Sequence, residues 1–291
     1  MKILINGVHL YFDVEGLALR PEGGAMVEKP SLILLHGGPG ADHTLYKPAF
    51  SALTDIAQVI YLDHCGNGRS DSGPEADWTL KQWADDVHGF CVALGIDKPI
   101  VYGASFGGMV AMAYAIRHAR HAGKLVLVST TAQACSHTAA KVAMFAQLGG
   151  PAAGELAHRR FVLGDTGAEV LREWIRVALP LYTQCVPEPL AWHRQVFNER
   201  VRERFFGPGG EGRAFDMLAN VGKITCKTLI LGGQLDPMIP VECQRDIAAA
   251  IRQELVEFHE FANCGHGVVA DEPEAFMAVL RRFIQCAQGH A

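Results

Sequence analysis

The chain has 291 residues, of which 49% are hydrophobic, and it carries a formal net charge of −5 at pH 7. A chain of this size can bury a substantial core, and its balanced charge gives no reason to expect nucleic acid or an anionic membrane as a partner. The first residues stop being apolar too early for a signal-peptide core, and no apolar run is long enough to span a bilayer. We therefore expect a soluble cytoplasmic protein.

The eight cysteines are scattered, with no Cys-x-x-Cys pair and no metal-ligand spacing. In a chain without a signal peptide, such cysteines are expected to be reduced and mostly buried. The sequence therefore predicts neither a disulfide framework nor a metal site.

From residue 31 onward, short apolar runs alternate with helical patterns, which is typical of a mainly parallel sheet covered by helices. Strands are predicted at residues 31–36, 58–62, 99–102, 124–128, 227–231 and 254–261. Helices are predicted from residue 79 to 94, from the turn after the third strand to about residue 118, and from residue 272 to 285. These elements predict an α/β fold.

The alternation stops between residues 133 and 221. Strand-like runs disappear there, helical patterns dominate, and aromatic residues such as Trp174 and Trp192 are interspersed among arginines. We interpret residues 133–221 as a helical cap inserted into a core formed by residues 1–132 and 222–291.

The segment Gly-Ala-Ser-Phe-Gly at 103–107 matches the pattern G-x-S-x-G, with a predicted strand before it and a helix after it. In this context the chain reverses sharply at the serine, and small neighbours let the strand and helix approach each other. The reversal exposes the Ser105 hydroxyl at a helix N-terminus, where free N–H groups and the helix dipole favour developing negative charge. Ser105 is therefore the candidate nucleophile.

A nucleophilic serine needs a base, and the base needs an orienting acid. Asp236 follows the strand at 227–231, and His266 follows the last strand, so both lie at the sheet edge where Ser105 lies. We expect Asp236 as the acid and His266 as the base. Asp63 is expected to shape a turn, and Asp271 is expected to cap the following helix.

A tetrahedral intermediate also needs N–H donors for its oxyanion. One is expected from Phe106, the residue after the nucleophile. The glycine-rich segment at 36–40, His-Gly-Gly-Pro-Gly, follows an early strand and can supply the second donor, for which Gly38 is favoured and Gly37 is the alternative.

With these residues, the chain resembles the α/β-hydrolase superfamily, and His-Gly-Gly-Pro-Gly at 36–40 is similar to the signature of the proline iminopeptidase family. The resemblance covers the core segments. It implies Ser105, Asp236 and His266 as a triad, and Gly38 with Phe106 at the oxyanion hole.

Three features differ from the peptidases. At the turn that carries the serine, the peptidases usually have Gly-Gly-Ser-Trp-Gly, where this chain has Gly-Ala-Ser-Phe-Gly at 103–107. In the turn after the second predicted strand they usually have Asp-Gln-Arg-Gly, where this chain has Asp-His-Cys-Gly at 63–66. Their cap carboxylates hold the free amino group of the substrate, whereas Glu199 and Glu203 here are flanked by arginines and fit a salt-bridged helix face.

The expected activity is hydrolysis of a small ester, lactone or amide through an acyl-enzyme, without a metal or organic cofactor. Proline iminopeptidase-type aminopeptidase activity is the first alternative. Carbon–carbon bond hydrolysis or lyase chemistry on the same triad, and a low-turnover small-molecule receptor, are the others. The substrate and the oligomeric state are left open.

Overall fold

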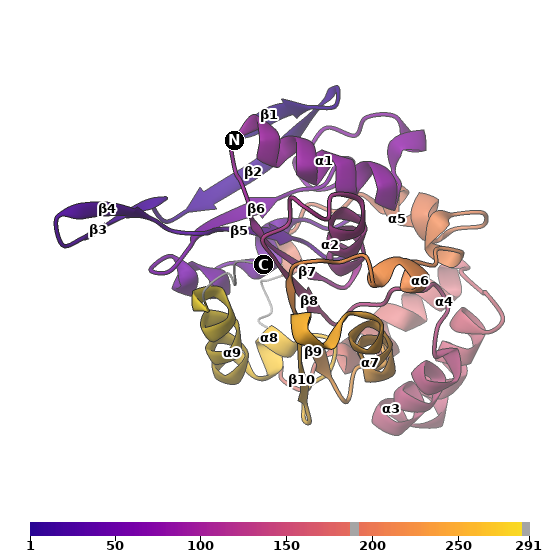
Figure 1. Ribbon diagram of the computed structural model, residues 1–291. Helices are drawn as coiled ribbons and strands as arrows, with labels where there is room; N and C mark the ends of the chain where they lie inside the picture. Colours follow the sequence, from indigo (N-terminus) through magenta and orange to yellow (C-terminus); the bar gives the residue numbers. More distant parts are fainter. Residues whose placement is uncertain (187–191, 287–291) are drawn as a thin grey trace.

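The computed structural model describes residues 1–186 and 192–286, and within them a central eight-stranded sheet has the order β1-β2-β6-β5-β7-β8-β9-β10 (Figure 1). Its strands are β1 (Lys2–Ile5), β2 (Val8–Glu15), β5 (Ser31–Leu35), β6 (Gln58–Leu62), β7 (Ile100–Ala104), β8 (Lys124–Val128), β9 (Lys227–Gly233) and β10 (Val256–Phe261). Strands β5 to β10 are parallel to one another, whereas β2 is antiparallel to both of its neighbours, β1 and β6. The mainly parallel sheet expected from the sequence is confirmed.

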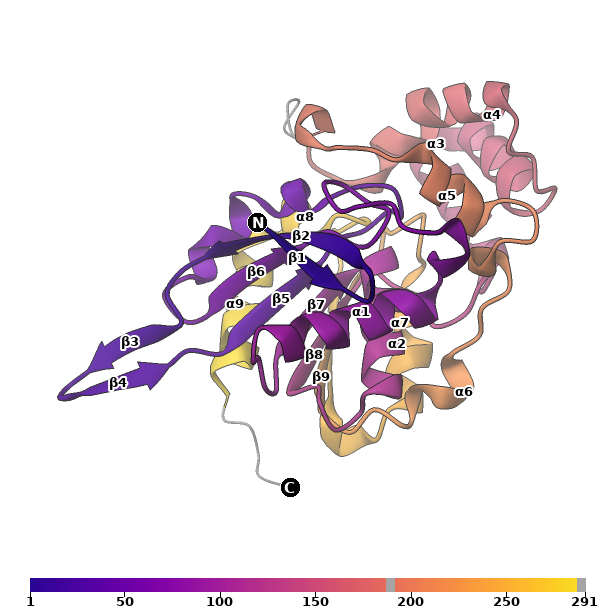
Figure 2. The same cartoon turned by 90° about the horizontal axis from the view of Figure 1, so that it is seen from above.

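The first two strands extend the sheet at its antiparallel edge and were not predicted. A separate two-stranded ribbon is formed by β3 (Leu19–Glu22) and β4 (Ala25–Glu28). It is exposed along its whole length and projects away from the body of the protein (Figures 1 and 2).

Helices cover both faces of the sheet because its central strands are apolar on both sides. Ile33 and Leu35 pack toward α1 (Leu80–Ala93), α2 (Phe106–Arg117) and α7 (Val241–Ala250). The alternate residues Leu32 and Leu34 pack toward α8 (Val268–Asp271), α9 (Pro273–Gln285) and the short helix Ala49–Leu53. The loops that follow β5, β7, β9 and β10 come together at the carboxyl edge of the sheet, between these two layers of helices.

The segment between β8 and β9 is largely helical. It contains α3 (Thr138–Phe161), which bends at Gly150, together with α4 (Ala168–Glu173), α5 (Glu199–Phe206), α6 (Leu218–Val221) and the short helical turns Trp174–Ala178, Leu179–Tyr182, Trp192–Arg194 and Glu211–Arg213. Figure 2 shows α3, α4 and α5 gathered on one side of the sheet. Phe145, Val170 and Trp174 belong to a small core of this segment, separate from the cores on the two faces of the sheet.

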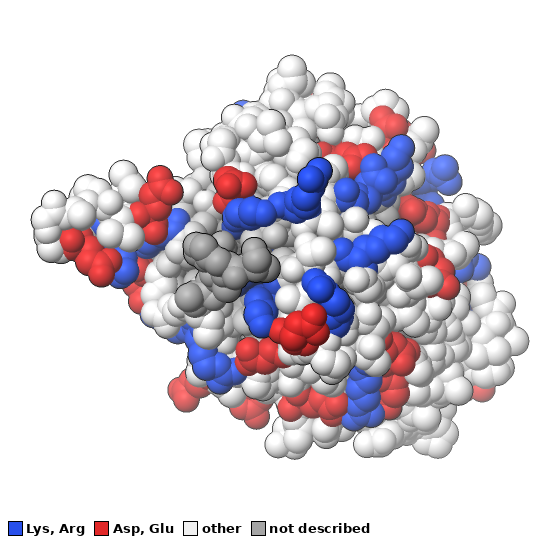
Figure 3. Space-filling model, viewed as in Figure 1, with Lys and Arg blue, Asp and Glu red and all other residues white. Residues whose placement is uncertain are grey.

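Two surface properties complete the description. On the face in Figure 3, basic and acidic side chains are interspersed rather than separated into areas of one sign. In the described part of the chain, no helix combines the length and apolar character that crossing a membrane requires.

Candidate active site

Ser105 occupies a strained turn between β7 and α2. Its backbone has φ 53° and ψ −119°, which is rare for a residue with a side chain. Glycines make the turn possible: a Cβ on Gly103 would lie 2.2 Å from the carbonyl oxygen of Gly107, and one on Gly107 would lie 2.0 Å from that of Leu35. The strand–serine–helix arrangement is therefore the one that the motif requires.

Hydrogen bonds from the neighbouring strand end hold this turn. The backbone N–H of Ser105 donates to Val128 at 2.9 Å, and the hydroxyl of Thr130 donates to the carbonyl oxygen of Ser105 at 2.7 Å. The side-chain amide of Gln244, on α7, donates to the carbonyl oxygen of Thr130 at 2.7 Å. These bonds offset part of the strain at the serine.

Asp236 and His266 form a buried pair beyond the ends of β9 and β10. Nδ1 of His266 lies 2.8 Å from Oδ2 of Asp236, which is only 1% exposed. The other carboxylate oxygen accepts the backbone N–H groups of Met238 and Ile239 at 2.8 and 2.9 Å. Both oxygens are thus used, and the carboxylate is fixed in one orientation toward the imidazole.

The glycine segment after β5 lies beside the serine. A Cβ on Gly37 would be 3.6 Å from Cβ of Ser105, and Gly38 has φ 122°, a conformation that favours glycine. Nε2 of His36 accepts the N–H of His64 at 3.2 Å, so its Nδ1 carries the proton and donates to the carbonyl oxygen of Gly37 at 2.8 Å. Burial lowers the pKa of His36, which supports a neutral, structural histidine.

Asp63 organises the turn after β6. Its carboxylate accepts Nδ1 of His43 at 2.7 Å and the N–H of Arg69 at 2.9 Å. Burial would raise the pKa of Asp63, but the hydrogen bonds and the neighbouring histidines bring it below the ordinary value. These contacts give Asp63 a structural role.

Asp271 differs from the sequence expectation, because its side chain caps no helix. One oxygen accepts the N–H groups of Gln184 and Cys185 at 2.8 and 3.0 Å, and the other accepts the N–H of Gly265 at 2.7 Å. Helix α9 instead begins at Pro273 without a side-chain cap. Asp271 therefore joins the helical segment to the loop that carries His266.

Tyr182, which sequence reasoning did not single out, contacts the histidine directly. Its carbonyl oxygen accepts the N–H of His266 at 2.6 Å, and the two rings meet edge to face with centroids 5.7 Å apart. The Tyr182 hydroxyl accepts the indole N–H of Trp174 at 3.0 Å. Burial raises the pKa of Tyr182 to about 12, so the phenol is neutral.

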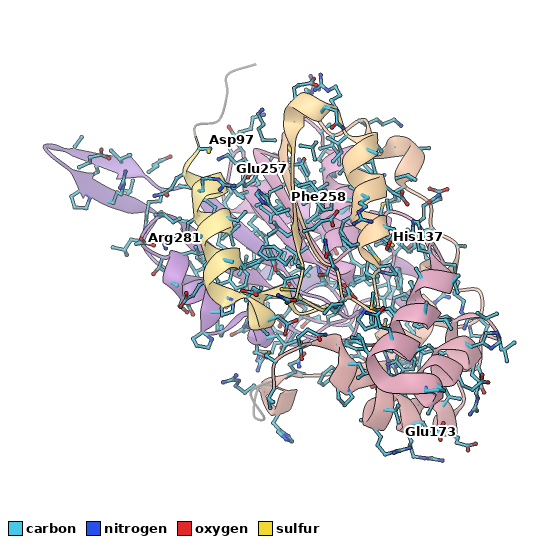
Figure 4. The ribbon with its side chains drawn as sticks, turned by 90° about the horizontal axis from the view of Figure 1, so that it is seen from below. Asp97, His137, Glu173, Glu257, Phe258 and Arg281 are labelled. Atoms are coloured by element: carbon cyan, nitrogen blue, oxygen red, sulfur yellow. The ribbon has the colours of Figure 1, made fainter. Side chains whose placement is uncertain are left out.

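A second attachment holds the helical segment over the glycine loop. The N–H of Asn198 donates to the carbonyl oxygen of Gly40 at 2.7 Å, and its side-chain amide donates to that of Gly66 at 2.8 Å. The N–H of Val196 reaches Oδ2 of Asp42 at 3.0 Å. At the beginning of the segment, His137, which Figure 4 labels, pairs with Asp246 of α7 at 2.6 Å.

A surface hollow elsewhere on the protein is not this site. It lies between α1, α2 and the segment leading to α6, and its walls include Leu80, Ala113, Ile116 and Met217. None of Ser105, Asp236 and His266 lines it.

The sheet order and the serine turn together define the class of protein. The model of the alpha/beta hydrolase fold matches residues 30–161. The chain is 27% identical over 286 residues to RutD of Caulobacter vibrioides, a candidate carbamate hydrolase, with 94% of this chain and 97% of that protein covered. It is 26% identical to a proline iminopeptidase of Clostridium botulinum, with 88% and 90% covered.

Solved structures of other proteins have the same fold. VinJ superposes with a TM-score of 0.81 at 22% identity, with 98% of this chain and 97% of that chain covered. The proline iminopeptidase of Mycobacterium smegmatis has a TM-score of 0.80 at 22% identity and the same coverage. The chain is thus an enzyme of the α/β-hydrolase fold and is proline iminopeptidase-like, as its glycine segment predicted.

Proposed function

We propose that the chain is a serine hydrolase in which Ser105 is the nucleophile, His266 the general base and Asp236 the orienting acid. The observation that carries this proposal is the 2.8 Å hydrogen bond between His266 and the buried Asp236, at the sheet edge where Ser105 stands in its strained turn. The three side chains come from loops that follow β7, β9 and β10, as the hydrolase mechanism requires.

In the proposed reaction, Oγ of Ser105 attacks the substrate carbonyl while Nε2 of His266 takes the proton of the Ser105 hydroxyl. The carboxylate of Asp236 accepts the hydrogen bond of the Nδ1–H group of His266, keeps its negative charge and stabilises the imidazolium that forms. His266 then protonates the leaving group. A water molecule next attacks the acyl-enzyme while His266 takes its proton, and the acyl group leaves as the proton returns to Ser105.

The oxyanion would be held by backbone N–H groups. Phe106 is the first residue of α2, where an N–H has no partner within the helix. The second donor comes from Gly38 or Gly37, and the proximity of Gly37 to Ser105 supports this part of the site. A Cβ on Gly38 would lie 3.1 Å from the backbone nitrogens of Gly40 and Ala41, so a side chain there would disturb the turn itself.

Residues 133–221 act in this proposal as the cap, and the core comprises residues 1–132 and 222–291. The bonds from Tyr182 to His266 and from Asn198 to Gly40 support it, because they join the helical segment to loops on both sides of Ser105. The substrate would lie between the cap and these loops. A cytoplasmic location is also proposed, supported by eight cysteines that all occur as free thiols.

The favoured substrates are small esters and lactones, with amides included. Proline iminopeptidase-type activity is the second candidate, because relatives with that name align over most of the chain. Of the two cap carboxylates flanked by arginines, Glu199 accepts Nε of Arg202 at 2.9 Å, which weakens its support for this activity. Glu203 is exposed and has no ion pair among the described residues, so it is the better candidate to hold a substrate amine.

The test is labelling with a fluorophosphonate probe, alongside p-nitrophenyl acetate hydrolysis and a screen of proline amides. We expect the wild type to be labelled and active, and Ser105→Ala to lose both properties. Ser129→Ala is the matched control, because Ser129 follows the neighbouring strand β8 and its buried hydroxyl has no partner among the described residues. If a folded wild type stayed unlabelled, or Ser105→Ala kept the label, the proposal would be wrong.

A further inference from the structure

The helical segment carries two cations whose surroundings are unusual. Lys141, on α3, is only 8% exposed. Arg160, near the end of the same helix, is half-buried. Within residues 1–186 and 192–286, neither side chain has a hydrogen bond or ion pair with a carboxylate. Burying a charge without a partner is costly, so such groups are expected to have a function.

Both cations rest on the aromatic core of the cap. Nζ of Lys141 lies 5.4 Å from the ring centroid of Phe161, and the guanidinium carbon of Arg160 lies 4.5 Å from that of Trp174. The two rings touch edge to face, with centroids 5.4 Å apart. Cation–π contacts hold the charges in place but do not neutralise them.

This cluster is connected to the candidate triad. Trp174 donates to the hydroxyl of Tyr182 at 3.0 Å, and the ring of Tyr182 is 5.7 Å from that of His266. The same aromatic core packs against Met238, whose N–H binds the carboxylate of Asp236. The two cations therefore belong to the part of the cap that meets the catalytic loops.

The electrostatics agree with this placement. Burial raises the pKa of Tyr182, and the positive charge of Arg160 opposes that rise. Burial lowers the pKa of Lys141, and Cys243, Cys135 and Asp236, in that order, oppose the fall. Burial also lowers the pKa of Arg160. An anion brought to this place would reverse that loss.

We propose that Lys141 and Arg160 bind an anionic group of the substrate, so that the enzyme prefers esters or amides that also carry a carboxylate. This inference rests on the proposed hydrolase function and names its substrate class. The guanidinium of Arg160 suits a planar carboxylate, and the ammonium of Lys141 adds a second positive charge. A substrate with a free amine would be repelled by the same groups.

The test compares p-nitrophenyl hemiglutarate with p-nitrophenyl valerate, a neutral ester of the same acyl length. We expect the wild type to have a higher kcat/KM for the hemi-ester. Arg160→Met and Lys141→Met should each lower kcat/KM for the hemi-ester about tenfold or more, and should change that for the neutral ester less than about twofold. Arg176→Met is the matched control, because Arg176 is exposed on the same segment and its loss changes the net charge equally.

Binding without turnover separates this inference from the proposed function. Glutarate should raise the thermal unfolding midpoint of the wild type and of Arg176→Met, and should not raise that of Arg160→Met. If neither ester is hydrolysed but this shift is present, the hydrolase function fails and the anion site stands. If the esters are hydrolysed without preference, or all variants slow both esters equally, the anion site is wrong. If hydrolysis and the shift are both absent, the anion site is wrong as well.

Discussion

The carbonyl oxygen of Tyr182 accepts the backbone N–H of His266 at 2.6 Å, so the helical segment that we propose as the cap holds the loop of the candidate base directly. Asp271 strengthens this connection from the other side through the N–H groups of Gln184 and Gly265. The position of the base is therefore coupled to the position of the cap.

Gly265→Ala tests this coupling. A Cβ on Gly265 would lie 2.3 Å from the carbonyl oxygen of Tyr182, so the cap segment must move away from the loop. We expect kcat/KM for p-nitrophenyl acetate to fall about tenfold or more. Gly24→Ala is the control, since a Cβ there meets nothing within 4 Å. A Gly265→Ala enzyme with wild-type kinetics would show that the base does not depend on the cap.

Asp236→Asn should lower kcat by about 10³–10⁴-fold without unfolding the protein. The N–H groups of Met238 and Ile239 would bind the oxygen of the new amide, which turns its NH₂ group toward Nδ1 of His266. Nδ1 must then accept, and the proton moves to Nε2, where it blocks proton transfer from Ser105. The measurement is kcat with saturating ester, and a loss of less than tenfold would contradict the assigned role.

Asp86→Asn should make the protein more stable at pH 7. Asp86 is 3% exposed. Within the described part of the chain, only one of its oxygens accepts hydrogen bonds, from Asn6 and Gln82 at 2.8 Å each. Burial raises the pKa of Asp86 above the usual 3.8, so its contribution to stability is present at low pH and is lost as the pH rises through the folded-state pKa.

The unfolding midpoint of Asp86→Asn should therefore exceed that of the wild type by about 2 °C or more at pH 7, and the difference should shrink toward pH 4. Calorimetry across this range gives the answer. A difference that grew on acidification would contradict the assigned direction.

Asp63→Asn should make the protein less stable at pH 7. Because the folded-state pKa of Asp63 is lowered, its carboxylate stabilises the fold above the ordinary pKa of 3.8, and that contribution is lost as the pH falls through the folded-state value. We expect a loss of about 3 kcal/mol in the free energy of unfolding at pH 7, since a buried charged partner of His43 is removed. Urea unfolding at pH 7 and at acidic pH measures it, and a variant as stable as the wild type would sink this prediction.

The central parallel strands β5 to β9 could be predicted because each is a short apolar run, buried on both faces, that is followed by a polar residue. Strand β10 was recognisable by a different pattern, because its apolar Val256 and Phe258 alternate with polar residues. The same signal is missing in β3 and β4, whose residues are all exposed, so no apolar alternation marked them. Strand β2 does alternate, with Leu10 and Phe12 buried, but polar neighbours on both sides weaken the pattern. Its place at the sheet edge is set by pairing with β6, which is far from it in the sequence.

Some residues of the candidate site could also be predicted from the sequence, and others could not. Ser105, Asp236 and His266 can be proposed from the sequence because each follows a recognisable strand. Lys141 and Arg160 lie on a helix whose composition resembles that of many exposed helices. Their burial arises from packing against Phe161 and Trp174, and no local pattern encodes that contact.

Strand β10 lies at one edge of the sheet and follows the other strands in the described chain, and His266 comes after it. During synthesis the turn at Ser105 can form long before His266 leaves the ribosome. In the proposed mechanism, a growing chain would carry the nucleophile without its base until β10 and the loop after it have been made. Hydrolytic activity would then report that this edge strand has joined the sheet.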